Sequence, residues 1–286
     1  MMGDIRRQIL TTRLGAIEVA IAGDGPPVLS IHGGMGGFDQ SLLLARAAFA
    51  MPVRVVAVSR PGYLGTPLAD AGMPDAQADL YAAALDTLGI ARVHVIAVSA
   101  GGPSALAFAR RYPARCSGAV LVSCCTGRLA IPPEIRTRMP MMTLFARIPG
   151  LASFMRWRTR RDPLRSALRS IRDPDLAART LADAQAAPLL LALLSGVFER
   201  LRGRLPGTLN DMDVFARQDD IAGGEIAAPL LIVHGDADRV VPFAHASRLA
   251  DEAPNAMLMR IAAGEHVCLF THMRAIRERV ASFVAA

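Results

Sequence analysis

Ser99, Asp238 and His266 are the residues whose types and spacing best suit nucleophilic catalysis. A serine hydroxyl becomes a nucleophile when a base removes its proton, and histidine has the ordinary pKa best suited to act as base and acid near neutrality. A carboxylate can then hold the histidine in the tautomer that accepts the serine proton. Each of the three follows an apolar run, in the order Ser, Asp, His.

Ser99 lies where the predicted strand 93–99 meets the predicted helix 101–112. A serine on so sharp a turn is held in a strained conformation, with its Oγ above the sheet. The turn needs small residues two positions before and after the serine. Gly101 meets this need, whereas Ala97 replaces the first glycine of the usual G-x-S-x-G pattern. The alternative is an ordinary helix N-cap, so the partners of Ser99 decide its role.

The glycine-rich stretch "SIHGGMGGFDQ" follows another predicted strand, and such loops present backbone N–H groups to an anion. A dinucleotide site needs G-x-G-x-x-G, but Gly34 and Gly36 are followed by Asp39 where the third glycine belongs. A phosphate-binding P-loop needs a lysine, and the chain has none. We therefore expect an anion that forms only during a reaction.

Short β-branched runs alternate with alanine-rich helical patterns, which is typical of βαβ units and a parallel sheet. The predicted strands are 8–13, 17–22, 27–32, 54–59, 93–99, 118–124, 229–235 and 256–262. The first two flank a short turn and predict an antiparallel edge hairpin, and the others read as strands covered on both faces. The predicted helices are 39–50, 74–88, 101–112, 242–252 and 267–284.

Residues 126–224 interrupt this alternation with about a hundred residues of helical pattern and no convincing strand. We expect a core of residues 1–125 and 225–286, with 126–224 as a helical cap over the carboxyl edge of the sheet, where α/β ligand sites lie. The segment 138–157 is apolar enough to line a pocket, but packing against the core would explain its composition equally well.

The motifs "HGG", "SAGG", "GDADRVVP" and "GEH" at matching elements make nearly the whole chain resemble the α/β-hydrolase superfamily, in particular its capped, esterase-type branch. The resemblance implies an eight-stranded, mostly parallel sheet with helices on both faces and a cap inserted after strand 6. It makes Ser99 the nucleophile and His266 the base, and it favours Asp238 over Asp236 as the acid. It also implies an oxyanion hole formed by the N–H of Ala100 with that of Gly34, or alternatively Met35.

The leading hypothesis is a serine hydrolase of the carboxylesterase type, acting on small-molecule carboxylic esters through an acyl-enzyme. A C–C bond hydrolase, a prolyl aminopeptidase, a cofactor-free perhydrolase and an acyltransferase would use the same triad. A more remote alternative is a non-catalytic ligand-binding protein on the same fold, since a fold does not define a function. No cofactor and no metal are expected.

The net charge of +7 comes entirely from arginine, which would suit nucleic acid but fits equally a sequence biased toward arginine and alanine. Arg161, Arg165 and Arg169 lie on one helical stripe, for which we favour a solvated face over acidic-substrate recognition. We expect no nucleic-acid partner, no membrane span and a monomer or homodimer. The four cysteines lack C-x-x-C spacing, and no secretion signal is evident, so we expect free thiols and a cytoplasmic protein.

Overall fold

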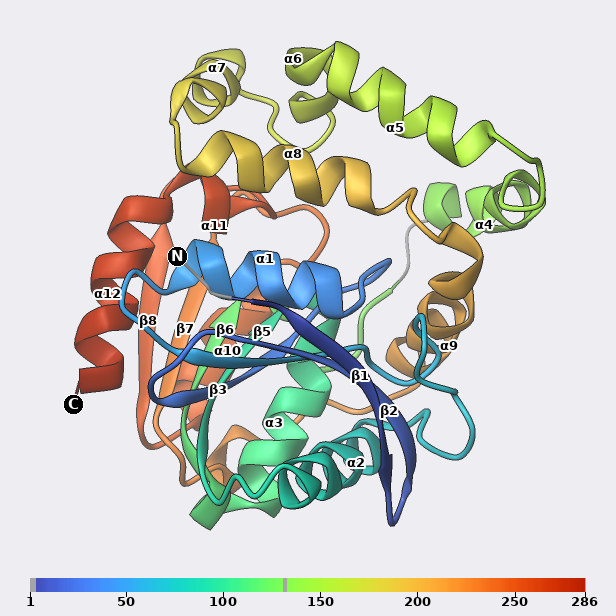
Figure 1. The fold of residues 1–286 in the computed structure, drawn as a ribbon. Coiled ribbons are helices and arrows are strands. Elements are labelled where there is room, and N and C mark those ends of the chain that lie inside the picture. Colours follow the sequence, from blue (N-terminus) through green and yellow to red (C-terminus); the bar gives the residue numbers. More distant parts are fainter. Residues whose placement is uncertain (1–3, 131–132, 286) are drawn as a thin grey trace.

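An eight-stranded sheet runs through the centre of the protein (Figure 1). The computed structural model describes residues 4–130 and 133–285; residues 1–3, 131–132 and 286, which fall within the predicted domain ranges, lie outside the described residues. The strands are β1 (Arg6–Thr12), β2 (Gly15–Ala22), β3 (Pro27–Ile31), β4 (Arg54–Val58), β5 (Val93–Val98), β6 (Cys116–Val122), β7 (Leu230–Gly235) and β8 (Ala256–Ile261).

The strand order is β1-β2-β4-β3-β5-β6-β7-β8. Strands β1 and β2 form an antiparallel hairpin, β2 pairs antiparallel with β4, and β3 to β8 are parallel. This confirms the predicted mostly parallel sheet with its antiparallel edge. The prediction that the last strand is covered on both faces was wrong. Strand β8 lies at the edge of the sheet, and its Met257 and Leu258 side chains are exposed.

Helices cover both faces of the sheet. One face carries α1 (Phe38–Ala48), α11 (Cys268–Thr271) and α12 (Met273–Ala285), and the other carries α2 (Pro74–Thr87), α3 (Gly102–Arg111) and α10 (Ala244–Glu252). The single helix predicted over 267–284 is interrupted at His272. The break lets α11 pack against the helices above the sheet while α12 runs along β7 and α1.

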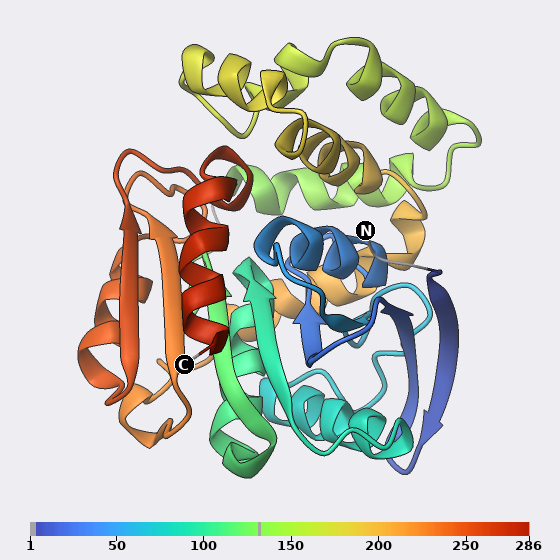
Figure 2. The same cartoon turned by 60° about the vertical axis from the view of Figure 1, so that its left-hand side comes forward.

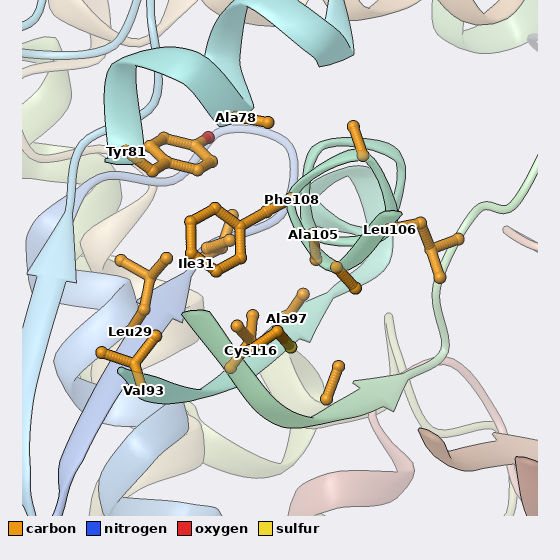
Figure 3. Close-up of a cluster of buried hydrophobic side chains, with 14 of the residues drawn as sticks. Leu29, Ile31, Ala78, Tyr81, Val93, Ala97, Ala105, Leu106, Phe108 and Cys116 are labelled. Carbon is orange, nitrogen blue, oxygen red and sulfur yellow. The ribbon is translucent and has the colours of Figure 1, made fainter. Parts of the chain in front are cut away.

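The core beneath α3 fixes the position of the strand that carries Ser99 (Figure 3). Phe108 and Ala105 of α3 pack over Ile31 of β3 and Ala97 of β5, and all four side chains are completely buried. Burying one large apolar side chain contributes about 1.5–3 kcal/mol. The small alanines let the helix approach the strands closely, which holds the junction between β5 and α3 rigid.

Helices alone occupy the described residues between β6 and β7, apart from loops and short 3₁₀ turns. They are α4 (Pro133–Phe145), α5 (Leu151–Arg161), α6 (Pro163–Ala167), α7 (Pro174–Ala182), α8 (Ala186–Gly196) and α9 (Leu205–Phe215). Helix α8 packs on α1, and α5, α6 and α7 pack on α8. Figures 1 and 2 show α5 to α8 stacked above the edge of the sheet where the parallel strands end.

Two ion pairs fasten the end of this insertion to the core. Arg60, which follows β4, makes two hydrogen bonds of 2.9 and 2.6 Å to the buried carboxylate of Asp211 on α9. Arg204, which immediately precedes α9 and is fully buried, pairs with Asp39 of α1 at 2.5 Å. Burial makes an unpaired charge costly, so α9 is held firmly against the core.

Among the described residues no single helix is long and apolar enough to cross a membrane. By length and composition alone, α7 and α8 taken together would be long and apolar enough, but these two helices meet at a bend of 110°.

Candidate active site

The register of the central strands brings the glycine-rich loop against Ser99. Ile31 at the end of β3 pairs with Ala97 of β5, so the residues two positions further along each chain are neighbours. A Cβ placed on Gly33 would lie 3.1 Å from the Cβ of Ser99, closer than nine in ten real contacts of this kind. A Cβ at this position would require its neighbours to shift by a few tenths of an ångström, so glycine suits the close approach of the loop to this serine.

The backbone of Ser99 is strained. Its φ is +53°, a conformation that costs a residue other than glycine roughly 1–3 kcal/mol and is found most often at functional sites. Gly101 is required next to it, because a Cβ there would lie 2.7 Å from the carbonyl oxygen of His32. At the other small position Ala97 fits within the buried strand, so the departure from the usual glycine is accommodated.

His266 lies in the loop after β8 and hydrogen-bonds to both partners predicted for it. Its Nε2 is 3.0 Å from Oγ of Ser99, and its Nδ1 is 2.8 Å from Oδ2 of Asp238. A carboxylate can only accept, so Nδ1 carries the proton and Nε2 is free to accept one from the Ser99 hydroxyl. The structure thus brings together the three residues that the sequence indicated.

Asp238 is held as an acceptor from several directions. Its side chain is fully buried, and Oδ1 accepts hydrogen bonds of 2.8 and 3.0 Å from the amides of Val240 and Val241. His234 approaches Oδ2 at 3.4 Å through Nε2, which is also 2.9 Å from the Val241 carbonyl. Burial alone would raise the pKa of Asp238, but hydrogen bonds from His234 and His266 outweigh it and lower the pKa well below its usual range.

Asp236, the rival acid, is engaged elsewhere. Its carboxylate accepts hydrogen bonds from Nε of Arg260 at 2.8 Å and from the amide of Ala263 at 2.7 Å. The hydrogen bond from Arg260 lowers the pKa of Asp236. This acid ties the loop after β7 to strand β8 and its turn, whereas Asp238 is the acid that reaches His266.

The two candidates for the second oxyanion donor differ in their hydrogen bonding. The amide of Met35 donates to Oγ1 of Thr208 on α9 at 3.2 Å, and the Met35 backbone has a φ of +55°. Gly34 lines a cavity beside Ser99, and its amide makes no hydrogen bond with any residue in ranges 4–130 and 133–285. This difference favours Gly34 over Met35 as the donor predicted to act beside Ala100, which directly follows Ser99.

His32 fixes the start of the glycine-rich loop. Its Nε2 accepts a 2.9 Å hydrogen bond from the amide of Arg60, and its Nδ1 therefore carries the proton and donates to the Gly33 carbonyl at 2.7 Å. Burial, followed by the charge of Arg60, lowers the pKa of His32 well below its usual value. The ring is thus neutral and sets the orientation of the peptide after Gly33.

An apolar cavity of about 200 Å³ opens beside Ser99 and His266. The core contributes Gly33, Gly34, Gln40, Leu44, Val98, Val122, Val267, Leu269 and Phe270, and the helical insertion contributes Ser170, Leu193, Leu194 and Val197. No lining residue carries an arginine, aspartate or glutamate side chain. The cavity therefore suits an uncharged, largely apolar group next to the serine.

The segment 138–157 does not line this cavity. Its Met139 is buried against Leu201 and Leu205, with Met35 packed on the same cluster. The insertion lines it instead with Leu193 and Leu194 of α8, which lies on α1 above the sheet, and with Ser170 and Val197 outside that helix. The run of apolar residues in α8 carries the signal for this role, but a buried helix that only packs would look the same in sequence.

Metal ligands and reactive thiols do not gather at the site. Within the described residues no group of three or more His, Cys, Asp and Glu side chains could hold a metal ion. The four cysteines are buried and unpaired, as expected. Burial raises the pKa of Cys268 to about 11, so its thiol is not activated.

Comparison with known proteins extends these observations. The uncharacterised hydrolase YcgS of Bacillus subtilis is 34% identical over 135 residues, which cover 47% of this chain and 47% of YcgS, so the match spans about half of that relative. The 2-hydroxy-6-oxo-6-phenylhexa-2,4-dienoate hydrolase of Burkholderia cepacia is 25% identical over 284 residues, covering 94% of this chain and 91% of that protein.

A solved structure of an alpha/beta hydrolase fold protein from Nakamurella multipartita is similar throughout. It is 31% identical, with a TM-score of 0.86, and covers 97% of this chain and 98% of that one. The sequence model of the alpha/beta hydrolase fold family matches residues 26–273, from the residue before β3 to the first residue of α12. On its sheet, its strand order and this match, the chain belongs to the α/β-hydrolase fold family.

Proposed function

We propose that the protein is a serine hydrolase that cleaves small-molecule carboxylic esters through an acyl-enzyme. The observation that carries the proposal is the continuous hydrogen-bonded relay from Oγ of Ser99 through His266 to the buried Asp238, with distances of 3.0 and 2.8 Å. Both distances lie within the reach that proton transfer between a nucleophile and its base requires.

In the proposed reaction, Nε2 of His266 takes the proton of Ser99 as Oγ attacks the ester carbonyl. The N–H groups of Ala100 and Gly34 stabilise the oxyanion, and losing one such donor typically costs about 3–4 kcal/mol of transition-state stabilisation. Protonated His266 then gives its proton to the departing alcohol. Water, deprotonated by the same imidazole, attacks the acyl-serine. As the bond to Ser99 breaks and the acid leaves, protonated His266 gives this proton back to Oγ of Ser99.

The cavity defines the acyl side of the substrate. Its volume of about 200 Å³ is below the roughly 300–1,000 Å³ of pockets for drug-sized ligands, which favours a short acyl group. Its lining is apolar except for Ser99, His266, Gln40 and Ser170. Residues 126–224 act in this proposal as a cap domain on a core of residues 1–125 and 225–286, since α8 forms one wall of the cavity.

The second candidate is C–C bond hydrolysis by the same triad. It is favoured by similarity to the Burkholderia cepacia hydrolase, whose named substrate is a dienoate and therefore carries a carboxylate. A site for that carboxylate needs a cationic or hydrogen-bonding partner, and no arginine lines the cavity. Besides Ser99 and His266, the lining offers such a carboxylate only the uncharged side chains of Gln40 and Ser170, with no cationic partner, and this favours the ester reaction.

A fluorophosphonate probe tests the nucleophile. We expect it to label the wild-type protein at Ser99 and to leave Ser99→Ala unlabelled, while Ser153→Ala, changed at an exposed serine of α5, labels normally. Absence of wild-type labelling would contradict the serine-hydrolase proposal and leave the non-catalytic binding protein as the better account.

Substrate assays then separate the two reactions. We expect p-nitrophenyl acetate and butyrate to be hydrolysed faster than the octanoate, and all rates to collapse in His266→Ala. The competing substrate is 2-hydroxy-6-oxo-6-phenylhexa-2,4-dienoate. A higher kcat/KM for this dienoate than for any of the esters would favour the C–C hydrolase instead.

A further inference from the structure

Exposed apolar side chains are concentrated on one part of the helical insertion. Half of the large apolar side chains that are exposed in the described ranges lie between residues 141 and 168: Met141, Leu144, Phe145, Ile148, Phe154, Trp157, Leu164 and Leu168. Soluble monomers rarely gather exposed apolar groups in this way unless the surface binds something. We refer to residues 141–169, which span the end of α4 together with α5 and α6, as the basic arm.

Arginines dominate the charge of the basic arm. It carries Arg147, Arg156, Arg158, Arg160, Arg161, Arg165 and Arg169, against a single acid, Asp162. Asp162 accepts the amide of Arg165 as the N-cap of α6, and Arg156 pairs at 3.4 Å with Glu199 outside the arm. The arm therefore presents a strong positive charge to the solvent.

A groove joins the two kinds of side chain. It has a volume of about 350 Å³ and is lined by Trp157, Arg158, Arg161, Asp162, Arg165, Ser166 and Arg169. Trp157 also stacks on Phe154 with ring centroids 5.8 Å apart, and the guanidinium of Arg161 lies over its ring at 5.4 Å. Figures 1 and 2 show α5 and α6 on the outer side of the insertion, with α8 between them and α1.

We propose that the basic arm is a peripheral docking surface for a bilayer that contains anionic phospholipid. Arginines beside Trp, Phe and Leu side chains on a surface helix are the pattern by which proteins lie in the membrane interface. The groove lined by Arg161 and Arg165 receives headgroup phosphates, and Phe154, Trp157 and Leu164 enter the boundary with the acyl chains.

Charge and polarity distinguish this occupant from others. Two copies of the arm would place like charges against each other, which opposes a dimer through this face. A nucleic acid would neutralise the arginines but leave Leu164 and Leu168 without an apolar environment. An anionic bilayer satisfies both groups of side chains. The proposal does not depend on the reaction assigned to Ser99.

Trp157 is the only tryptophan in the chain, so its fluorescence reports on the arm directly. The full-length protein is titrated with vesicles of phosphatidylcholine alone and of phosphatidylcholine mixed with an equal amount of phosphatidylglycerol. We expect Trp157 emission to move to shorter wavelength with the anionic vesicles only, and the binding to weaken as salt is added. An equal response to both vesicle types overturns the proposal.

Cosedimentation with the same vesicles tests the residues. Each arginine near an anionic surface is worth roughly fivefold in partitioning, so Arg161→Gln with Arg165→Gln should lower partitioning about thirty-fold. The matched control removes two exposed arginines elsewhere, Arg13→Gln in the β1–β2 turn with Arg92→Gln before β5. We expect this control to bind as the wild type does.

A third variant, Leu164→Ser, should weaken partitioning severalfold while its salt dependence stays as in the wild type. All the changed side chains are exposed, and circular dichroism checks that each variant is folded. The proposal fails if the Arg161/Arg165 variant partitions as the wild type does. It also fails if the arm instead mediates self-association, seen as concentration-dependent dimers that this variant abolishes, without vesicle binding.

Discussion

The backbone amide of Met35 donates a 3.2 Å hydrogen bond to Oγ1 of Thr208, and this contact joins the glycine-rich loop to helix α9. Thr208 in turn donates to the carbonyl of Arg204 at 2.9 Å. The carbonyl of Met35 also accepts the Gln40 side chain at 3.2 Å. The amide and the carbonyl of Met35 are thus both hydrogen-bonded, which holds the residue in its strained conformation. Gly34, which precedes it, lines the cavity beside Ser99.

The first prediction concerns this hydrogen bond. Thr208→Val keeps the shape of the side chain but removes the acceptor, which costs about 1–3 kcal/mol for a partly buried amide. The loop can recover part of that energy by turning the Met35 amide toward other partners, which moves Gly34. We expect kcat for ester hydrolysis to fall about tenfold with little change in KM, measured by steady-state kinetics.

Thr208→Ser is the matched control, because it restores the acceptor without the methyl group. It should return kcat close to the wild-type value. A valine variant with wild-type kcat, or a serine variant as slow as the valine variant, would show that the hydrogen bond does not position the loop.

The second prediction separates the two acids of the loop after β7. In Asp238→Asn the amide NH₂ faces His266, so Nδ1 must accept and Nε2 carries the proton, leaving no base for Ser99. We expect kcat to fall about ten-thousand-fold, as in other triads with this change. Asp236→Asn should retain nearly full activity, because Asp236 contacts only the β8 side. Comparable losses in both variants would contradict the assignment.

Sequence could predict the positions of Ser99, Asp238 and His266 because the rule that governs them is local. Each follows a recognisable apolar strand within a few residues, and the carboxyl ends of parallel strands meet at one edge of a sheet. The strand pattern and the chain order pointed to Ser99 and His266, whereas the choice of Asp238 over Asp236 rested on the resemblance to the α/β-hydrolase superfamily. No contact within the helical insertion was needed.

Contacts that depend on how the insertion packs could not be predicted. Nothing in the spacing of Thr208 or Asp211 indicates that α9 lies against Met35 and Arg60. The apolar pattern of α8 is common to any buried helix, so sequence could not choose it over residues 138–157 as the cavity wall. Likewise the break at His272 reflects two packing partners, above the sheet and along it, rather than a helix-ending residue.

The third prediction concerns acyl-chain length. Leu193 of α8 lines the cavity, and Leu193→Ala enlarges it toward the insertion. Each methylene that a fitted pocket accommodates contributes about 1–3 kcal/mol to transition-state binding. We expect the ratio of kcat/KM for p-nitrophenyl octanoate over acetate to rise at least about tenfold. Leu189→Ala, on the same helix but outside the lining, should leave the ratio unchanged; a parallel shift there would mean that loosening of α8 alone is responsible.

The fourth prediction concerns stability and pH at His32. Its folded-state pKa is lowered below the ordinary value of 6.5, so the unfolded chain binds more protons as the pH falls. The contribution of neutral His32 to stability is fully present above pH 6.5 and is lost as the pH drops toward the folded-state pKa. Urea unfolding from pH 8 to 5 should show the free energy of unfolding falling, and falling less steeply in His32→Gln.

His94, His245 and His272 also have lowered pKa values because of burial, so the variant should reduce this pH dependence without abolishing it. His272→Gln, at a half-buried ring, serves for comparison and should have a smaller effect. An identical slope in the wild type and His32→Gln would contradict the buried neutral state of this ring.

The fifth prediction concerns the Arg60–Asp211 pair. Both side chains are buried, and Tyr63 also donates to Asp211 at 2.6 Å. Asp211→Asn leaves the guanidinium buried without its counterion, which typically costs about 3–5 kcal/mol. Replacing both residues, as Arg60→Met with Asp211→Leu, removes the unpaired charge and should cost less than Asp211→Asn alone. Urea unfolding of the two variants measures this difference, and a double variant that is less stable than the single one would show that the ion pair itself holds α9 on the core.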